Sequence, residues 1–512
     1  MQFRYTLKNL CKCGSKVCNW RTCTKISTQN QSCIHNIHNC VMEPCIPLPL
    51  KDDVLTELTQ KAKDWALLHG IGMRSSKDIN KDTIQLAPFV LLPSTFSKKE
   101  FDKAKVAQVL MNEIIHKAAH SYNFLKQCLS GTVEVDPFTA ELFRIYETVR
   151  REGLAQSLSL GLIRSDYMLD TINESCLKQV EINTIAAGFG WMGPISSKLH
   201  RYVLHELGIP DIENHIPRNN ALRGLSEAIN FAWKLYGSPN AVLLVIVEEQ
   251  TYNLCDQRML EFDVRELNNA IRVIRRTFRN IASNGKLKDK RLFIDEMEVA
   301  VAYYRTGYSP DDYKSYQAWD ARMLIERSKA IKCPSIQYHL AGTKKVQQEL
   351  NRKGVLESFL SNSEHIDRVR SLFTGLYSLD MNEEGDEIIK MAIDNPSKYV
   401  LKPQREGGGN NFYDKDVRIM LRKMETSEER NAYILMDLIS PPAVLNYIIA
   451  PGSPPELCKV VGELGVFGAT IGSDKEIFYN EEVGHLLRTK RFNIREGGVV
   501  AGFAALDSVF LV

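Results

Sequence analysis

Apolar residues in the first third of the chain recur at helical spacing. From Leu50 to His69 they fall every three to four positions, and the same period runs through Phe101 to Leu129. Such spacing places the apolar residues on one face of a helix, which can then pack against a core. The pattern predicts a mostly helical N-terminal region.

Shorter apolar runs and alternating patterns predict strands further along. Leu162–Leu169 and Lys178–Ile185 are expected as two strands, the second with apolar and polar residues in alternation. Between Ala241 and Arg305 the pattern indicates a strand (AVLLVIV), a polar loop, a helix over Asn268–Ile281 and a second strand (VAVAYYR). That order is typical of a small parallel α/β unit.

The last third returns to helices and then to strands. A helical region follows Leu340, and strands are expected around Lys402, over AYILMDLI, and from Gly465 to Tyr479. Few helices separate these strands, so a mainly antiparallel sheet is predicted here. At 512 residues the chain is expected to form two or three domains of a mixed α/β protein.

The charge is unevenly distributed. The net charge is +3, yet the first acidic residue is Glu43; six of the 65 basic residues precede it, which leaves 59 against 62 acidic residues in the body. A body of this balance is not expected to bind nucleic acid. No segment is long and apolar enough to predict a membrane span.

The basic leader, residues 1–42, also holds many of the cysteines and no acidic residue. We expect it to be disordered or dispensable, with Met42 as an alternative start. A cytoplasmic protein is predicted, and organelle targeting by the leader is left open. The remaining cysteines are scattered, which favours a reducing compartment over a disulfide framework.

The segment Tyr399–Tyr413, YVLKPQREGGGNNFY, is the strongest functional signal. Three glycines let backbone N–H groups approach a polyphosphate, Lys402 adds a positive charge, and Glu406 offers an oxygen ligand for magnesium. A glycine-rich hairpin is the alternative interpretation, but the flanking Lys, Arg, Glu and Asn residues favour the phosphate site. The loop matches neither the P-loop nor the dinucleotide fingerprint.

A second polar pair lies on the predicted strand QVEINTI. Glu181 and Asn183 are two residues apart, so both project from one face of the strand. Their oxygens suit Mg²⁺, although such a pair is commonly only the solvated face of a half-buried strand. Together with Glu406 the pair indicates a metal and nucleotide site.

Three arginines, Arg164, Arg305 and Arg488, each follow an apolar run and are interpreted as strand-end groups for an anionic substrate. The alternative for each is a surface arginine or a structural ion pair. A segment near the C-terminus, Gly497–Gly502 (GGVVAG), suits a mobile lid, or else a tight turn. No Ser/His/Asp or Cys/His nucleophile is recognisable. The residues alone indicate a magnesium nucleotide enzyme that acts on an anionic small molecule.

Several motifs together resemble the eukaryotic glutathione synthetases. They are YVLKPQREGGGNN, QVEINTI, LAGTKKVQQEL, FTGLYSLD and EVGHLLRTK, and the resemblance runs from about Leu50 to Val512. It implies an ATP-grasp fold, a homodimer, and ATP-dependent ligation of γ-glutamylcysteine to glycine. The expected division is a leader (1–42), a helical part with the first ATP-grasp strands (43–235), an inserted parallel α/β substrate domain (236–345) and a nucleotide-binding part (346–512).

The resemblance also implies roles for individual residues. Two magnesium ions would be held by Glu181, Asn183 and Glu406. ATP would be surrounded by Glu181, Lys344, Lys402, Pro403, Gln404, Arg405, Glu406, Gly407, Gly408, Gly409, Asn410, Asn411, Tyr413, Met436, Asp437, Leu438, Ile439, Glu463, Lys490 and Glu496. The peptide would contact Arg164, Asn253, Gln257, Arg305, Tyr308, Arg488, Val499 and Val500, and catalysis would involve Arg164, Arg488, Gly407 and Gly408.

Departures from the family pattern fall on the substrate side. Ala186 and Gly188 stand where serines are usual, Thr251 where a glutamate is common, and Val500 where an alanine is usual. A paralogous ligase with a changed dipeptide or acceptor, as for a homoglutathione-like product, is therefore the first alternative. A non-catalytic nucleotide-binding partner of an active synthetase is the second.

Overall fold

The computed structural model describes residues 41–75, 82–172, 176–407, 409–499, 502 and 504–512, together with the backbone of two short strands in the leader. Those strands, β1 (Cys11–Cys13) and β2 (Lys16–Cys18), pair with each other in antiparallel fashion. Gly408 and Val500 lie outside the described residues. Among the described residues, none of the helices has the length and apolar character needed to cross a bilayer.

The expected helical N-terminal region is present. Its helices are α1 (Asp52–Leu68), α2 (Lys98–His120), α3 (Tyr122–Val135) and α4 (Pro137–Arg151). The expected helical stretch through Leu129 is divided at Ser121, an extended residue between α2 and α3. The side chain of Ser97 caps α2, and Asp136 caps α4 with Pro137 at its first position.

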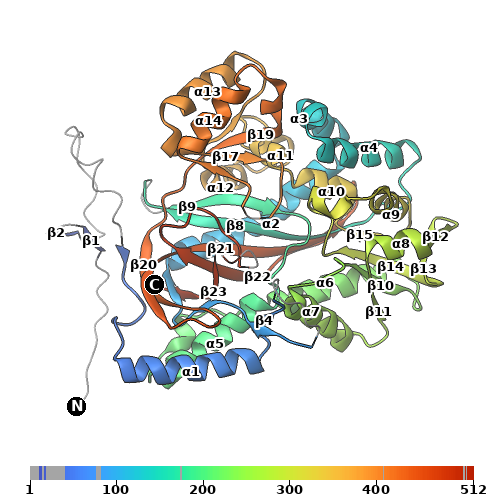
Figure 1. The fold of residues 1–512 in the computed structure, drawn as a ribbon. Helices are drawn as coiled ribbons and strands as arrows, with labels where there is room; N and C mark the ends of the chain where they lie inside the picture. Colours follow the sequence, from blue (N-terminus) through green and yellow to red (C-terminus); the bar gives the residue numbers. More distant parts are fainter. Residues whose placement is uncertain are drawn as a thin grey trace.

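A 14-stranded mixed sheet forms the centre of the molecule (Figure 1). Along its main path lie β11 (Val273–Arg276), β10 (Val242–Ile246), β14 (Met297–Tyr304), β15 (Ile331–Cys333), β8 (Ser159–Asp170), β21 (Glu456–Gly472), β22 (Ile477–Arg491), β23 (Ala505–Asp507), β6 (Phe89–Val90), β20 (Ala443–Ile449) and β3 (Val41–Met42). Beside this path, β9 (Cys176–Asn183) pairs with β8, while β12 (Gly285–Lys288) and β13 (Arg291–Ile294) form a hairpin next to β14.

The predicted strands are confirmed in this sheet. The four strands from β11 to β15 are parallel, and β15 also pairs in parallel with β8. From β8 the sheet continues through antiparallel β9, β21 and β22. The parallel unit therefore shares one continuous sheet with the strands that carry Arg164 and Arg488.

The helix predicted over Asn268–Ile281 is wrong. The helix of this unit is α7 (Leu254–Leu267), which lies in the segment interpreted as a polar loop, and residues 273–276 form strand β11. Val273 and Ile274 belong to a short apolar run that pairs with β10, and this pairing prevailed over the helix-like spacing from Ile271 to Ile281. Six acidic and basic residues between Leu254 and Leu267 had concealed the apolar stripe of α7.

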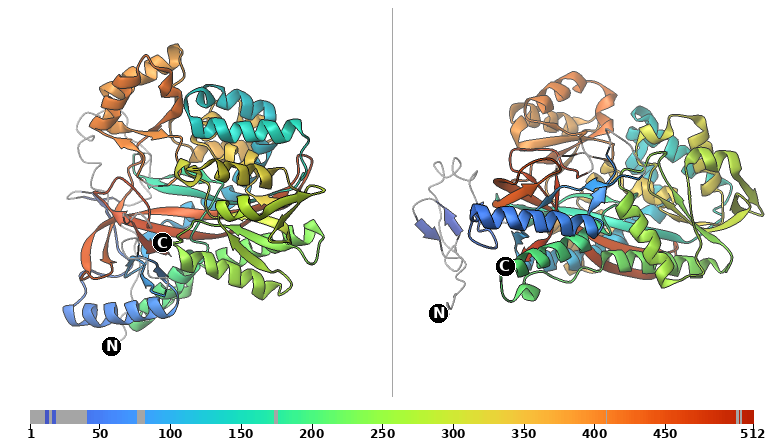
Figure 2. Two further views of the ribbon diagram at one scale, coloured as in Figure 1. Left: turned by 45° about the vertical axis from the view of Figure 1, so that its right-hand side comes forward. Right: turned by 60° about the horizontal axis from the view of Figure 1, so that its bottom comes forward.

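Helices cover both faces of the large sheet, and each face has its own core (Figures 1 and 2). Strand β10 divides its residues between the two: Val242, Leu244 and Ile246 pack on one face and Leu243 and Val245 on the other. One face is covered by α2, α4, α9 (Tyr316–Glu326), α10 (Ile336–Ala341), α11 (Lys344–Leu350) and α12 (Ser363–Leu372). The opposite face is covered by α1, α5 (Met192–Glu206), α6 (Ala221–Tyr236) and α7.

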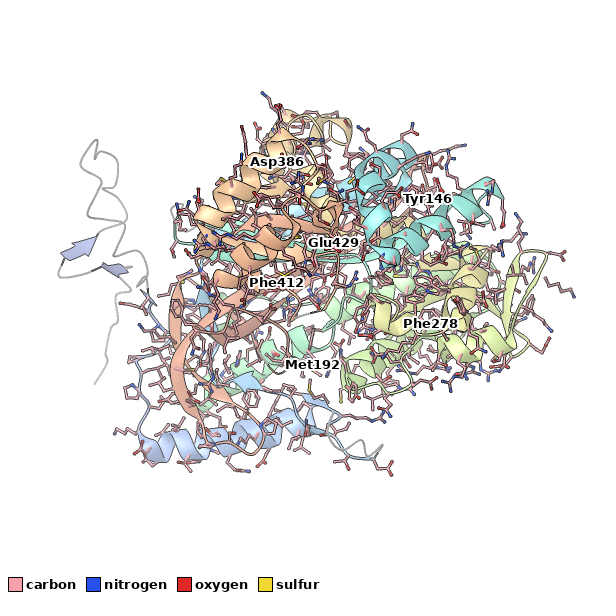
Figure 3. The ribbon with its side chains drawn as sticks, turned by 45° about the horizontal axis from the view of Figure 1, so that its top comes forward. Tyr146, Met192, Phe278, Asp386, Phe412 and Glu429 are labelled. Carbon is pink, nitrogen blue, oxygen red and sulfur yellow. The ribbon has the colours of Figure 1, made fainter. Side chains whose placement is uncertain are left out.

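A smaller antiparallel sheet stands above the large one in Figure 1. Its strands are β16 (Leu376–Ser378), β19 (Tyr433–Asp437), β17 (Tyr399–Pro403) and β18 (Phe412–Tyr413). Helices α13 (Glu383–Asp394) and α14 (Lys415–Met424) complete this small unit, which has a separate hydrophobic core. Figure 3 labels Asp386 on α13 and Phe412 on β18 within it.

The remaining elements are short. They are β4 (Gly72–Met73), β5 (Gln85–Leu86), β7 (Ser94–Phe96), α8 (Phe278–Asn284) and β24 (Val509–Leu511), with 3-10 turns at Ile212–Asn214, Pro310–Tyr313, Leu356–Ser358, Pro396–Lys398 and Glu428–Ala432. Strand β24 pairs in parallel with β7, so the C-terminus is held against the N-terminal region.

Candidate active site

Lys344 contacts residues of both the small unit and the large sheet. It begins α11, and its Nζ donates to the backbone carbonyl of Arg405 at 2.7 Å and to Oε1 of Glu406 at 3.2 Å. Oε2 of Glu181, from β9, lies 3.8 Å from the same nitrogen. Lys402 approaches from β17 and donates to the carbonyl of Val180 at 3.0 Å. Residues predicted to bind nucleotide and metal from three separate segments are thus brought together.

The two carboxylates in this cluster differ in their tendency to ionise. Burial raises the pKa of Glu406, and the charge of Glu181 adds to this rise while Lys344 opposes it. Burial also acts to raise the pKa of Glu181, but the charges of Lys344, Lys402, Arg488 and Arg164 outweigh it and lower the pKa. Burial lowers the pKa of Lys402. Glu406 is therefore a carboxylate that would be stabilised by one more positive charge.

The glycine-rich loop lies against the C-terminal segment through Glu496. Its carboxylate accepts the backbone N–H of Gly409 at 3.0 Å and that of Asn411 at 3.3 Å. Gly407 and Gly409 have φ values of 86° and 91°, which other residues adopt only with strain. Tyr413 donates to the carbonyl of Arg495 at 3.5 Å, and Lys490 donates to that same carbonyl. The glycine-rich loop is thus in direct contact with the residues that immediately precede the predicted lid, Gly497–Gly502.

Other residues of the predicted nucleotide set have local structural partners. Asn410 donates to the carbonyl of Gly407 at 2.9 Å, and the Oε1 atom of Gln404 accepts from the backbone of Lys345 at 3.2 Å. The guanidinium of Arg405 pairs with Asp136 at 2.7 Å, so its backbone carbonyl, and not its side chain, faces Lys344. Pro403 pairs with Tyr433 in the small sheet.

The edge segment Met436–Ile439 runs alongside β17 and leaves the small sheet. Met436 is buried and pairs with Val400, while the backbone N–H of Leu438 donates to Lys398. The Asp437 carboxylate accepts the Gly375 N–H at 3.1 Å and the Tyr377 hydroxyl at 3.2 Å. Ile439 packs on a small cluster that includes Met168 and Val461 of the large sheet. The segment therefore connects the two units beside Lys402.

Asp166 is hydrogen-bonded to residues predicted to contact the peptide, a group called here the peptide side of the site. This fully buried residue of β8 accepts from Arg164 through Nε at 2.6 Å and Nη2 at 2.8 Å. Its Oδ2 also accepts from Arg488 at 2.9 Å and from the amide of Asn183 at 3.0 Å. Arg488 in turn bonds Glu463, which lies opposite it on the neighbouring strand β21. Three predicted site residues are thus held by one carboxylate that was not among those predicted, and Arg488 links a fourth, Glu463, to the same network.

A sequence signal for Asp166 was available. Arg164 and Asp166 are two residues apart on β8, so both project from one face of the strand. A glycine lies beside them: a Cβ at Gly465 of β21 would stand 2.8 Å from Cδ of Arg164 and 2.9 Å from Oδ1 of Asp166. Only a residue without a side chain leaves room for this pair.

The interpretation of the arginines as strand-end groups holds for one of the three. Arg305 directly follows β14, whereas Arg164 and Arg488 lie within the long strands β8 and β22. Both strands extend well beyond their apolar runs because they are paired on both sides in the central sheet. Their arginines consequently rise from the middle of a sheet face.

A tight turn after β9 connects the two sets of arginines. Arg164 donates to the carbonyl of Gly188 at 3.1 Å, and Arg305 donates to that of Ala187 at 3.1 Å. Ala186 and Phe189 in this turn have positive φ values of 51° and 75°, an uncommon conformation for residues with side chains that concentrates at functional sites. A Cβ at Gly188 would lie 3.1 Å from Nη2 of Arg305. The glycine therefore leaves space directly in front of that guanidinium.

Asn253 and Tyr308 lie close to Arg305, whereas Gln257 contacts Arg275. Asn253 donates to Asp256 at 3.4 Å, and its Oδ1 is buried without a protein partner. Gln257 accepts from Arg275 at 2.9 Å, and the hydroxyl of Thr251 accepts from the same guanidinium at 3.1 Å. Nε of Arg305 is also buried without a partner. Unpaired polar atoms in a buried site are consistent with groups that await a ligand.

A pocket joins the two sides of the site. It is lined by Asn183, Tyr308, Lys344, Gln404 and Glu406, with further residues from α4 and α10. Val499 differs from the other predicted substrate residues because its side chain is buried in the core beneath the large sheet. Only its backbone remains for substrate contact.

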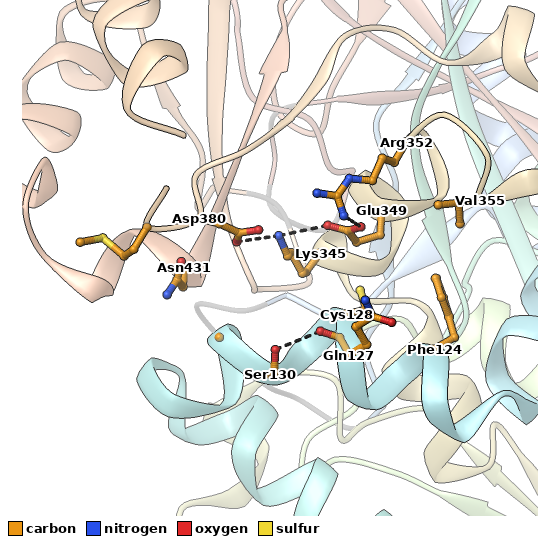
Figure 4. A pocket seen from close by; sticks show the side chains of 12 residues that line it. Phe124, Gln127, Cys128, Ser130, Lys345, Glu349, Arg352, Val355, Asp380 and Asn431 are labelled. Atoms are coloured by element: carbon orange, nitrogen blue, oxygen red, sulfur yellow. Dashed lines mark hydrogen bonds and ion pairs between the residues drawn. The ribbon is translucent and has the colours of Figure 1, made fainter. Parts of the chain in front are cut away.

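A larger hollow of about 320 Å³ lies between α3 and α11 (Figure 4). Its charged groups are paired with one another: Lys345 contacts Asp380 at 2.9 Å and Glu349 at 3.4 Å, and Glu349 contacts Arg352 at 3.0 Å. Lys344 and Lys345 therefore point to different sides of one short helix. The Lys344 ammonium contacts the converging site residues, and the Lys345 ammonium lines the hollow.

The donor set suits a magnesium ion between the two units. Glu181 and Glu406 present hard carboxylate oxygens on either side of Lys344, and the raised pKa of Glu406 indicates a local shortage of positive charge. The described residues form no group of three or more His, Cys, Asp or Glu side chains with metal-binding geometry. A site with two carboxylates and the neighbouring Asn183 fits an ion that also takes water and phosphate oxygens.

Comparison with known proteins identifies the family of the chain. A family model described as eukaryotic glutathione synthase, ATP binding domain, matches residues 52–511. The chain is 45% identical over 463 residues to a glutathione synthetase of Homo sapiens, covering 90% of this chain and 97% of that protein. It is 40% identical over 473 residues to a chloroplastic glutathione synthetase of Arabidopsis thaliana, covering 90% and 86%.

A solved structure is also similar. The apo form of a glutathione synthetase-like effector from Globodera pallida superposes with a TM-score of 0.74 at 25% identity, covering 91% of this chain and all of that one. The match extends through the large sheet, the small unit and the segments that carry the site residues. The chain belongs to the eukaryotic glutathione synthase family.

Proposed function

We propose that the protein is a glutathione synthetase, which ligates γ-glutamylcysteine to glycine at the expense of ATP. The observation that carries the proposal is the convergence of Glu181, Lys344, Lys402 and Glu406. Two of them, Lys344 and Glu406, line a pocket together with Asn183 and Tyr308. A polyphosphate and an anionic peptide could meet there. Membership of the family supports the same activity.

The chemistry follows from this arrangement. The cysteinyl carboxylate attacks the terminal phosphate of ATP to give an acyl phosphate and ADP, and the amine of glycine then displaces phosphate. Lys344 and Lys402 neutralise phosphate charge, while Arg164, Arg305 and Arg488 orient the peptide, so positioning and electrostatic stabilisation supply the catalysis. Glu181 and Glu406, with Asn183, would hold two magnesium ions, which when bound offset the negative charge of the phosphates.

Water must be kept from the acyl phosphate. The contact of Glu496 with Gly409 and Asn411 supports a role for the glycine-rich loop and the C-terminal segment as joint lids. Gly407 and Gly408 would supply backbone N–H groups to the phosphates, and Val499 and Val500 would contact the peptide from the lid. Tyr413, Glu463 and Lys490 would complete the nucleotide pocket.

We extend the proposal to the architecture of the whole chain. Residues 43–235 and 346–512 would form an ATP-grasp fold, with Met436–Ile439 beside the adenine, and residues 236–345 would form the substrate domain. The active form would be a homodimer in the cytoplasm. Organelle targeting through residues 1–42 remains an alternative, and the name of a relative such as the chloroplastic enzyme of Arabidopsis thaliana motivates testing it.

The activity can be measured directly. Purified protein is given γ-glutamylcysteine, glycine and MgATP, and ADP formation is followed together with glutathione by mass spectrometry. We expect ADP formation that depends on both the peptide and the acceptor. Absence of peptide-dependent ADP formation would contradict the proposal.

The turn at Ala186 and Gly188 favours one alternative strongly enough to test it. Because Gly188 leaves space in front of Arg305, a different dipeptide or acceptor could be accommodated. Comparing turnover with glycine, β-alanine and serine separates the two ligases: equal or better use of a non-glycine acceptor favours the paralogue. A non-catalytic nucleotide-binding partner predicts no turnover with any acceptor.

A further inference from the structure

One carboxylate near the peptide side has a single weak hydrogen bond among the described contacts. Glu248 lies two residues after the end of β10, at the same edge of the parallel strands from which Arg305 emerges after β14. Ligands of such sheets bind outside the carboxyl ends of the strands. The side chain is half-buried, and its Oε1 accepts from the hydroxyl of Tyr308 at 3.5 Å.

The neighbouring carboxylates are already occupied. Asp256 accepts the backbone N–H groups of Phe189 and Trp191 at 2.7 and 2.9 Å, and Arg305 lies 3.8 Å away. Asp312 accepts the N–H groups of three consecutive residues, Gly307 to Ser309. Glu261 is bound by Arg258 and Arg275. Among these groups, Glu248 is the carboxylate with capacity for a new partner.

The electrostatic setting of Glu248 favours a cation from outside the protein. Burial raises its pKa, the charge of Asp312 raises it further, and Arg305 opposes both. The guanidinium of Arg305 is directed to the carbonyl of Ala187 and the hydroxyl of Tyr303, at 3.1 and 3.3 Å. Its attraction for Glu248 is therefore incomplete, and a further positive charge beside Glu248 would stabilise the ionised carboxylate.

We propose that Glu248 binds the α-ammonium group of the peptide substrate, with the hydroxyl of Tyr308 fixing the carboxylate. The inference rests on the proposed function and identifies the group that binds the free amine of the γ-glutamyl end. An amino-acid head group carries an ammonium and a carboxylate on one carbon. Glu248 and Arg305, whose Nε has no protein partner, offer the two complementary charges at one edge of the sheet.

The test compares two substrates in three proteins. γ-Glutamylcysteine and glutarylcysteine differ only by the α-amino group, and each is given to the wild type, Glu248→Gln and Glu249→Gln. Glu249 is the matched control, because it follows Glu248 in the same loop but its side chain is 62% exposed and, among the described residues, its ion pair is with Arg279 at 3.8 Å. The kcat/KM for each substrate is measured at saturating ATP and glycine.

We expect the wild type and Glu249→Gln to prefer the amine-bearing substrate by roughly 10- to 100-fold. In Glu248→Gln the preference should fall below about threefold, mainly through a higher KM for γ-glutamylcysteine, with the KM for ATP unchanged. If Glu248 had a merely structural role, the substitution would change kcat/KM for both substrates by the same factor. An unchanged preference in Glu248→Gln, with its thermal midpoint preserved, would overturn the inference.

Two further measurements keep the inference separate from the proposed function. If the wild type turns over neither substrate, the proposed function fails, and calorimetric binding of γ-glutamylcysteine decides the inference: tenfold weaker binding by Glu248→Gln supports it, whereas equal or undetectable binding by the wild type overturns it. If Glu248→Gln does not fold, Glu248→Asp retains the charge on a shorter side chain. That variant should keep part of the preference, and complete retention of the wild-type value with an equal KM would count against the inference.

Discussion

The nucleotide side and the peptide side of the site hold their charges in different ways. On the peptide side, Arg164 and Asp166 of β8 and Arg488 of β22 belong to one large sheet, and both arginines are already hydrogen-bonded to Asp166 without a ligand. On the nucleotide side, Lys344 lies between Glu181 of the large sheet and Glu406 of the small unit. The peptide side is preformed, whereas the nucleotide side is assembled from two bodies.

The hydrophobic cores reflect the same difference. The small unit has its own core, which includes Ile389, Leu401 and Leu435, separate from the two cores on the faces of the large sheet. A body with its own core can move without exposing the core of its neighbour. We therefore expect ligand binding to shift the small unit and to leave the arginine cluster in place.

The largest expected effect is on turnover in Glu406→Gln. The substitution keeps the side-chain shape but removes the charge that faces Lys344 and would hold magnesium, so kcat should fall by roughly 10²- to 10³-fold. Steady-state ADP formation measures it. The control is Glu387→Gln, an exposed carboxylate on α13 of the same unit, which should keep wild-type turnover. Wild-type kcat in Glu406→Gln would remove this residue from the nucleotide side.

The second effect, in Asp166→Asn, concerns the preformed side. Removing one charge from a buried ion-pair network should lower the free energy of unfolding by about 3–5 kcal/mol and raise the KM for the peptide. Denaturant unfolding measures the first quantity. Glu456→Gln, which breaks the exposed pair with Arg491, should cost far less, because exposed ion pairs contribute little to stability. Similar losses in both variants would mean that the Asp166 network is not preformed.

A third, smaller effect distinguishes ATP binding from peptide binding. Lys402→Met should raise the KM for ATP by about tenfold, the equivalent of about 1.4 kcal/mol, because a buried ammonium beside the phosphates is lost. The KM for the peptide should change less than twofold. Initial rates at varied ATP and varied peptide provide both values. An equal rise in both constants would show that the two sides are coupled more tightly than their separate cores indicate.

The last prediction concerns the pH dependence of stability rather than turnover. Asp507 is fully buried at the end of β23, beside β22; it accepts from Thr489 and from the backbone N–H of Ser94, and burial raises its pKa to about 7. Between about pH 4 and pH 7 the unfolded chain loses this proton while the folded protein keeps it. The free energy of unfolding should therefore decrease as pH rises, by at most about 1.4 kcal/mol per pH unit.

The variant Asp507→Asn should lack this component of the pH dependence. Its Oδ1 can still accept from Ser94, and unfolding curves collected from pH 4 to pH 8 provide the comparison. His200, whose pKa burial lowers to about 4, destabilises the fold in the opposite direction as pH falls below about 6.5. An identical slope for wild type and variant between pH 5 and pH 7 would contradict the assignment to Asp507.

Local patterns predicted most of the elements correctly. The strands at β8, β9, β10, β14 and β17 and the helix α1 agree with the expected segments to within a few residues. The helix expected over Asn268–Ile281 was wrong, since its apolar spacing fits a helix but its Val273–Ile274 run pairs with β10. Periodicity is a local property, and a neighbouring strand can override it.

The sequence by itself determined the chemical groups of the site and their faces on the strands. Glu181 with Asn183, and Arg164 with Asp166, are two residues apart, and a strand must place such pairs on one side. Tertiary structure alone decided which charges compensate one another, because Asp166 meets Arg488 and Lys344 meets Glu406 across long stretches of chain. It also left Glu248 with a single weak partner, which no local pattern could reveal, since a vacancy is defined by the neighbours that the fold supplies.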